Sequence, residues 1–202
     1  MKYVAKDLRN ARRTRQAKPE RKHTIDRLVV TRVPGANPSA GRLHAGQMTL
    51  RCAIGGGGVR RDKREGDHAT PAGSWRLLSA LYRPEKALPK TPQLPMRPIR
   101  KNQGWCDDPA SPLYNQLVVT PFRGSHESLW RDDGLYDIVI VLDYNIFPRR
   151  KQRGSAIFIH CAREKLGARN EFAPTEGCIA LRCEDLRRLL PRLSNRTVLT
   201  IR

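Results

Sequence analysis

The sequence is poor in aromatic residues and contains no long apolar run. Phe, Trp and Tyr make up 6% of its 202 residues, and it has no aromatic-rich strand motif of the RNA-binding kind, no helix-turn-helix pattern and no zinc-ligand spacing. These absences argue against a protein that reads nucleic-acid bases. No stretch approaches the roughly 20 consecutive apolar residues of a membrane-spanning helix, so we expect no transmembrane segment.

Acidic residues are scarce relative to basic ones. The chain has 39 Lys and Arg against 19 Asp and Glu, which gives a formal charge of +20. Such an excess attracts polyanions, which include nucleic acid, anionic membranes and acidic cell-wall polymers. Many basic residues fall early in the chain: Arg9, Arg12, Arg13, Arg15, Lys18, Arg21 and Lys22. We assign residues 1–26 to a basic N-terminal arm, either a solvated tail or a wall tether, and residues 27–202 to one domain.

The beginning of the chain lacks the apolar segment that a secretory signal peptide requires, although residues 1–32 are positively charged. The five cysteines are an odd number and include no Cys-x-x-Cys pair. This spacing argues against a thiol redox protein and against a zinc site, so we expect no metal and no cofactor.

Several short segments have the β-branched and apolar composition of strands and are separated by clusters of Gly, Pro and Asn. The predicted strands are residues 28–33, 48–54, 74–78, 117–119, 137–142, 156–161 and 197–201. One helix is expected over residues 184–193, where four leucines recur at the spacing of one helix face. The proline-rich residues 83–100 are expected to run over the surface. We predict a mainly β fold, a mixed sheet or β-sandwich with a few short helices, and a monomer.

A histidine and a cysteine form a candidate catalytic pair. His160 ends an apolar run, and Cys178 follows 18 positions later, between Gly177 and another apolar run. A thiol attacks only as thiolate, and a nearby imidazole can take its proton and later return it to a leaving group. Gly177 leaves room for backbone N–H groups to face a developing oxyanion. By spacing alone such a pair is more often part of the core, so the wider pattern has to decide.

A glycine-rich segment precedes a second loop motif. Residues 55–58 are all glycine but are not followed by the Gly-Lys-Ser/Thr of a phosphate-binding loop. The better interpretation is a turn that leads into residues 66–73, Gly-Asp-His-Ala-Thr-Pro-Ala-Gly. Asp67 and Thr70 can hydrogen-bond the backbone there, so we expect a structural role for this loop.

Further motifs occur in a fixed order along nearly the whole chain. Besides residues 66–73 and the His160…Gly177-Cys178 pattern, they are Glu65-Gly66-Asp67, Trp105-Cys106-Asp107-Asp108-Pro109, Leu129-Trp130-Arg131-Asp132-Asp133, Gly154-Ser155-Ala156 and Thr175-Glu176-Gly177-Cys178. From about Leu28 to Ile201, the chain resembles a compact, single-domain branch of the L,D-transpeptidases, the YkuD-type enzymes of bacterial cell walls. The resemblance implies that Cys178 is the nucleophile, that His160 carries the proton, and that the backbone carbonyl of Cys161 orients the ring. A disulfide among the other cysteines stays open if the protein works outside the cytoplasm.

The sequence departs from the common family motif at three positions. Thr175 stands where serine is usual and keeps the hydroxyl, and Cys161 follows the histidine where a small residue such as glycine is frequent. Ala180 occupies a position that is often arginine. A contact with a substrate carboxylate therefore has to come from another residue.

The loop segments before and after the predicted strand 117–119, together with the Thr175 loop, carry groups that suit a cleft for a polar peptide. Aromatic faces, carboxylates and amides can bind its amines and amides. We predict substrate contacts from Trp105, Asp107, Asp108, Tyr114, Asn115, Trp130, Arg131, Tyr144, Asn145 and Thr175. Each of these residues could instead form a turn or fill the core.

The resemblance implies a peptidoglycan transpeptidase. In the family reaction a cysteine acyl-enzyme forms on one stem peptide, and a diaminopimelate amine of a second stem resolves it into a crosslink. Water as the acceptor would make the protein an L,D-carboxypeptidase, and a first-residue (L-Ala) donor would give a different crosslink. An inactive cationic wall-binding protein is the non-enzymatic alternative. The family implies the periplasm or the cell wall as the location, although no signal peptide is visible in this chain.

Overall fold

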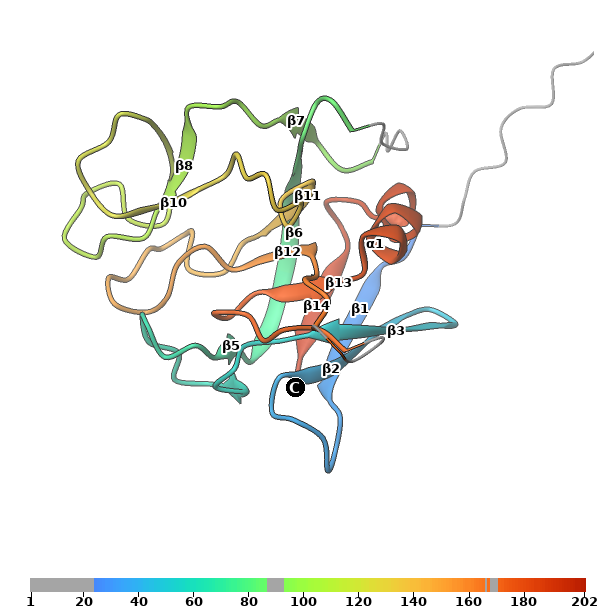
Figure 1. Cartoon of the computed structure of the whole chain (residues 1–202). Helices are drawn as coiled ribbons and strands as arrows, with labels where there is room; N and C mark the ends of the chain where they lie inside the picture. The colour runs from blue at the N-terminus through green and yellow to red at the C-terminus, as the bar shows by residue number, and fades with distance from the viewer. Residues whose placement is uncertain (1–23, 87–92, 166, 168–170) are drawn as a thin grey trace, which may run out of the picture.

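The computed structural model describes residues 24–86, 93–165, 167 and 171–202, and strands dominate it (Figure 1). The strands of the main sheet are β1 (Arg27–Arg32), β2 (Ala40–Ala45), β3 (Met48–Ala53), β6 (Gly73–Tyr82), β7 (Met96–Pro98), β11 (Ile138–Leu142), β12 (Phe158–Cys161), β13 (Ile179–Leu181) and β14 (Val198–Ile201). Their order is β11-β12-β13-β3-β2-β1-β14-β6-β7, and β11 also pairs with β6. The sheet therefore curves back on itself around a core.

The main sheet is mixed. β1 pairs with β14, β12 with β13 and β6 with β7 in parallel, whereas β2 pairs with β1 and β3 in antiparallel fashion. Side chains alternate across a strand, so one face of the sheet can be apolar throughout. This inner face buries the larger apolar cluster, in which Leu28, Leu43 and Ile140 have no exposed surface. The predicted mainly β architecture with mixed strand pairing is confirmed.

Two smaller sheets lie outside the main one. The remaining strands are β4 (Val59–Arg60), β5 (Thr70–Pro71), β8 (Gln103–Cys106), β9 (Leu117–Val119) and β10 (His126–Ser128). They form a three-stranded sheet of order β10-β8-β9 and a two-stranded pair of β4 with β5. A second apolar cluster joins the outer face of β11 and β12 to the three-stranded sheet, through Val139, Phe158 and Trp105 among others. Cys178 belongs to this second cluster, so the candidate nucleophile lies where the two sheets meet.

The expected helix over residues 184–193 is α1 (Cys183–Leu189) followed by the 3-10 turn η1 (Leu190–Arg192). The α-helix ends early because Pro191 has no N–H and cannot donate to the carbonyl one turn back. The apolar face is nevertheless as expected, because all four leucines are fully buried in the larger cluster. The helix follows β13 directly and covers that cluster.

The seven predicted strands correspond to β1, β3, β6, β9, β11, β12 and β14, with ends that differ by up to four residues. The segment 156–161 becomes a strand only from Phe158, because Ala156 has a positive φ of 51°. β2, which contains Gly41 and the charged Arg42, was not predicted from the sequence, and neither were most of the strands of two to four residues. Such short strands contain too few residues to show an alternating pattern.

Two further expectations are corrected. The segment 83–100 does not simply run over the surface, because β7 joins the main sheet there and Leu94 and Ile99 are buried; residues 87–92 lie outside the described residues. Ile25, assigned to the basic arm, is buried and donates its N–H to the Arg192 carbonyl at 2.8 Å. Residues 24–26 therefore pack against the domain, while residues 1–23 of the arm lie outside the described part of the chain.

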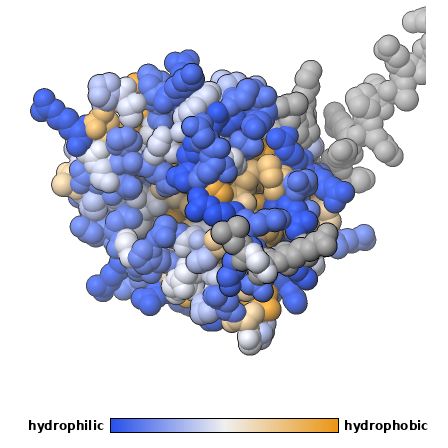
Figure 2. Space-filling view, in the orientation of Figure 1, coloured by the Kyte–Doolittle hydropathy of each residue, from blue (hydrophilic) through white to orange (hydrophobic). Residues whose placement is uncertain are grey.

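The visible face of the molecule is covered largely by hydrophilic residues, with small apolar areas between them (Figure 2). Within the described ranges, no helix is long and apolar enough to cross a membrane.

Candidate active site

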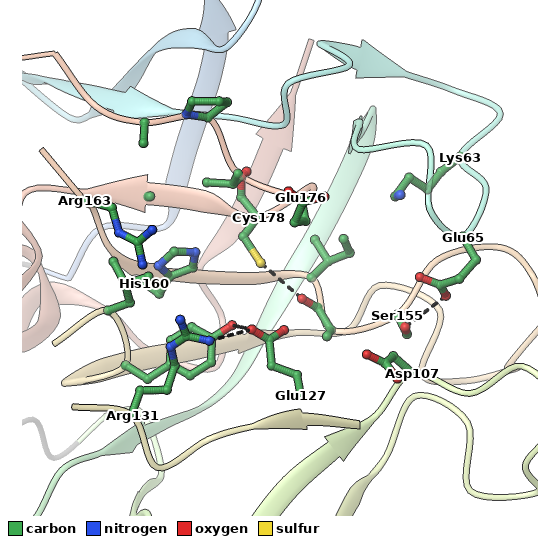
Figure 3. Close-up of a pocket in the computed structure, with 18 residues that line it drawn as sticks. Lys63, Glu65, Asp107, Glu127, Arg131, Ser155, His160, Arg163, Glu176 and Cys178 are labelled. Atoms are coloured by element: carbon green, nitrogen blue, oxygen red, sulfur yellow. Dashed lines mark hydrogen bonds and ion pairs between the residues drawn. The ribbon is translucent and has the colours of Figure 1, made fainter. Parts of the chain in front are cut away.

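The parallel pairing of β12 and β13 brings the candidate catalytic residues to one side of the main sheet. Ile159 lies opposite Ile179, and His160 lies opposite Ala180. Since side chains alternate, the two isoleucines enter the larger core, whereas His160 and Cys178 face the other side. There they line a cavity of about 490 Å³ that is bounded by β10, the strand ends and the Thr175 loop (Figure 3).

Cys178 is a buried thiol in this cavity. Its Sγ–H donates to the Ala156 carbonyl at 3.1 Å, and the sulfur accepts the Phe158 N–H at 3.3 Å. Burial, together with the negative charge of Glu127, raises the pKa of Cys178 to about 12. The resting nucleophile is therefore a neutral thiol at pH 7.

His160 lines the same cavity and is also buried (Figure 3). Its Nδ1–H donates to the Cys161 carbonyl at 2.8 Å, which is the contact that the family resemblance implied. A carbonyl only accepts, so this bond places the ring proton on Nδ1 and leaves Nε2 with a free lone pair. Burial lowers the pKa of His160 to about 4. The imidazole is thus a neutral proton acceptor, as a general base for a thiol has to be.

The loop that carries Cys178 is held by Thr175 and by close packing. The Thr175 hydroxyl donates to the Cys178 carbonyl at 2.7 Å and accepts the Gly177 N–H at 3.3 Å. Gly177 has a φ of +139°, and a Cβ at this position would lie 2.9 Å from the Ala69 carbonyl oxygen. Glycine is therefore required here by packing and by backbone conformation. Its oxyanion role stays a prediction.

The neighbouring loop of residues 66–73 is structural, as expected from its sequence. Asp67 accepts the N–H groups of Arg64 and Ala69, each at 2.9 Å, and forms an ion pair with the buried Lys63. The Thr70 hydroxyl accepts the Gly55 N–H at 2.8 Å. These bonds fix the backbone against which the Cys178 loop packs.

The family model of the L,D-transpeptidase catalytic domain (YkuD) matches residues 36–201, which is most of the chain. The chain belongs to this family. Among solved structures, it is similar to L,D-transpeptidase 1 of Mycobacterium tuberculosis, with 10% identity and a TM-score of 0.35. That match covers 86% of this chain and 60% of the mycobacterial chain, less than two thirds of its length. A comparison with curated proteins finds no match.

Three of the ten residues predicted to contact substrate line the cavity of this transpeptidase domain: Asp107, Arg131 and Thr175. The other seven lie outside its lining. Trp105 is buried and donates its indole N–H to the Asn115 side-chain oxygen at 2.8 Å. Its ring packs edge-on against the Phe158 ring, with 5.1 Å between the ring centroids.

Asn115 has a structural place close to the nucleophile. Its side-chain oxygen accepts the Ala156 N–H at 3.0 Å, and its amide nitrogen donates to the carbonyls of Tyr144 at 3.1 Å and Asn145 at 2.8 Å. Ala156 in turn accepts the Cys178 thiol. Asn115 therefore helps to position Ala156, the residue whose carbonyl holds the resting sulfur, and it does so from outside the cavity lining.

The remaining predicted residues also contact other parts of the protein, and their role in substrate binding stays a prediction. Tyr114 donates to Glu65, and the Tyr144 hydroxyl donates to the Arg153 carbonyl. The Asn145 amide donates to the Gly154 carbonyl at 2.8 Å, and Asp108 accepts the Ala110 N–H at 2.9 Å. The Trp130 ring lies under the Arg83 guanidinium at 3.8 Å. Loop residues of these types have the same sequence signature whether they bind a ligand or the backbone.

Several charged residues of the cavity were not predicted from the sequence: Lys63, Glu65, Glu127, Arg163 and Glu176. Lys63 could have been anticipated from the i,i+4 spacing to Asp67. Glu127 gives no such signal, because it lies on a strand of only three residues. Over the described ranges, no group of three or more His, Cys, Asp or Glu residues is arranged to hold a metal ion.

Proposed function

We propose that this protein is a peptidoglycan L,D-transpeptidase that forms crosslinks between stem peptides through an acyl-enzyme on Cys178. The observation that carries the proposal is that Cys178 and His160 line one cavity of a transpeptidase-family domain, and that the bond from His160 Nδ1–H to the Cys161 carbonyl leaves Nε2 as the proton acceptor. Since both groups are uncharged at rest, the proton has to move when substrate binds.

In the proposed reaction, the Cys178 thiol leaves the Ala156 carbonyl and gives its proton to His160 Nε2. The thiolate attacks a carbonyl of the donor stem, with the third stem residue as the donor of the usual family reaction. His160 then protonates the departing amine of the terminal residue, which leaves a thioester on Cys178. The side-chain amine of a diaminopimelate on a second stem attacks this thioester and releases the crosslinked product.

The cavity also supports recognition of an ionic peptide. Ala180 lies on its lining where the family often has arginine, and Arg163 lines the same cavity. Arg163, whose side chain is 59% exposed, is a candidate contact for a substrate carboxylate in place of the missing arginine. The charge of +20 concentrates an anionic wall polymer around the enzyme. We place the protein in the periplasm or cell wall, as a monomer.

The test is incubation with diaminopimelate-type muropeptides, followed by intact-protein and product mass spectrometry. We expect an acyl adduct on Cys178 and a crosslinked dimer, and fragmentation identifies whether the third residue or the first is the donor. Release of the terminal residue without a dimer would assign the L,D-carboxypeptidase activity instead. Adduct and dimer should both disappear in Cys178→Ala and persist in the control Cys183→Ala, since Cys183 lies outside the cavity lining. Full crosslinking by Cys178→Ala, or no adduct on the parent protein, would contradict the proposal.

A further inference from the structure

Glu127 is a carboxylate at the centre of the candidate active site that the mechanism above does not use. It lies on β10, opposite Trp105 of β8, and its side chain enters the cavity from the side facing Cys178 (Figure 3). Its side chain is 31% exposed. The fold has therefore brought a half-buried acid from a separate sheet to the nucleophile.

The contacts of Glu127 fix its position relative to His160. The carboxylate accepts the Tyr136 hydroxyl at 2.6 Å, and the Tyr136 ring packs edge-on against the His160 ring at 5.3 Å. Tyr136 is buried, so it has little freedom to move. The carboxylate, the phenol and the imidazole are thus linked by consecutive contacts.

The charge of Glu127 is only partly neutralised. Arg131 lies 3.6 Å from it but makes its two close bonds, of 2.6 and 3.1 Å, to Asp133. Burial is the main cause that raises the pKa of Glu127, and the negative charges of Asp107 and Glu176 raise it further. A carboxylate with a raised pKa accepts a proton more readily than an ordinary surface glutamate.

Asp107 provides a second carboxylate in the same cavity. One oxygen of its carboxylate is buried and has no hydrogen-bond partner among the residues that the structure describes. A buried acceptor without a partner is costly, so turning this oxygen towards a donor in the cavity would be favourable. A primary ammonium group offers three N–H donors and one positive charge, which suits a cavity lined by the carboxylates of Asp107 and Glu127.

We propose that Glu127 is a catalytic residue, the general base that deprotonates the acceptor amine, and that Asp107 helps to hold that amine. The proposal rests on the proposed transpeptidase function. It assigns the two halves of the reaction to different bases, because His160 serves the thiol and Glu127 serves the amine.

The chemistry balances without a further reactant. The acceptor enters as an ammonium and gives one proton to the Glu127 carboxylate, which later returns it to water. The free amine attacks the thioester carbonyl, so a C–N bond forms and the C–S bond breaks. The second proton of the nitrogen passes to the departing sulfur through His160. The products are an amide, a neutral Cys178 thiol and the starting carboxylate.

A two-stage experiment separates this proposal from the proposed function. In the first stage the donor is a disaccharide-tetrapeptide whose diaminopimelate side-chain amine is acetylated, so that it can acylate Cys178 but cannot serve as the acceptor. In the second stage an unmodified muropeptide is added as the acceptor. Acyl adduct, dimer and hydrolysed donor are measured by mass spectrometry for the parent protein, Glu127→Gln and the control Glu184→Gln, which changes a glutamate on α1 outside the cavity lining.

We expect Glu127→Gln to form the adduct at the parental rate or faster, because the negative charge of Glu127 raises the pKa of Cys178. Dimer should form about 100-fold more slowly, with hydrolysed donor accumulating instead. The amide can still accept the Tyr136 hydroxyl, so the fold is retained. Asp107→Asn should raise the acceptor concentration needed for half-maximal dimer formation, and Glu184→Gln should behave as the parent.

Dimer formation by Glu127→Gln at the parental rate would overturn the proposal. Loss of adduct and dimer together in this variant would also overturn it, because Glu127 would then act in the first stage. Failure of the parent protein to form any adduct would instead contradict the proposed function.

Discussion

At the scale of single residues, the environment of each cysteine decides its chemistry. Cys178 and Cys183 are both free thiols, yet their pKa values shift in opposite directions. Burial raises the pKa of Cys178 to about 12, whereas a hydrogen bond from Cys161, 3.0 Å away, and the positive charge of Arg187 lower the pKa of Cys183. The catalytic candidate is therefore the less ionised thiol at rest, because its activation awaits a base and a substrate.

This difference predicts the order of alkylation. At pH 7 and without substrate, iodoacetamide should modify Cys183 well before Cys178, as measured by peptide mass spectrometry over time. Only a thiolate reacts fast with iodoacetamide. The lowered pKa of Cys183 increases its thiolate fraction, whereas the raised pKa of Cys178 decreases the thiolate fraction of Cys178. Raising the pH towards 12 should speed the labelling of Cys178. Preferential labelling of Cys178 at pH 7, also seen in Cys183→Ser, would indicate a resting thiolate–imidazolium pair instead.

At the scale of elements, two loops and two strands create the site. β12 and β13 determine the positions of His160 and Cys178, and the loop of residues 66–73 packs against the Cys178 loop. Gly177 is the point of contact between the two loops, since a Cβ there would meet the Ala69 carbonyl. The glycine predicted for the oxyanion region thus also has a packing reason.

Replacing this glycine should disturb both stability and activity. We expect Gly177→Ala to lower the free energy of unfolding by about 1–3 kcal/mol, because alanine is strained at positive φ and its Cβ would meet backbone. The control is Gly35→Ala, which also has a positive φ but has no atom within 4 Å of the place where a Cβ would lie. Chemical denaturation of both variants measures the difference. Equal losses would show that strain, rather than the contact with Ala69, explains the glycine.

At the scale of the whole molecule, the excess of positive charge is a long-range property. The formal charge of +20 acts over the Debye length and does not depend on the shape of the cavity. It can concentrate the protein on an anionic wall polymer whether or not the active site works. Binding and catalysis should therefore respond differently to salt.

We expect binding to isolated wall sacculi, measured by co-sedimentation, to fall steeply as salt rises from about 0.01 M to about 1 M, which shortens the Debye length from about 30 Å to about 3 Å. Acylation of Cys178 by a small soluble muropeptide should fall much less over the same range, because it depends on short contacts inside the cavity. Binding that is insensitive to salt would show that the charge is not what attaches the protein to the wall.

Local patterns in the sequence were sufficient for the mainly β fold and the apolar face of α1, because both depend on the periodicity of apolar residues along the chain. The pair His160 and Cys178 was predicted from the order of several motifs and the family resemblance; both residues line one cavity, and their catalytic roles stay a prediction. The hydrogen bond from His160 to the Cys161 carbonyl is the one that the family resemblance implied.

Only the tertiary structure determined which other side chains share the cavity. Glu127 comes from a separate small sheet, and Asn115 reaches Ala156 across 41 positions of sequence. Trp105 and Asn115 have residue types that suit a binding cleft, yet folding buries them outside the cavity lining. The physical reason is that strand pairing between distant segments decides which loop side chains face the cavity and which form hydrogen bonds with the protein itself, and neither outcome is encoded in local composition.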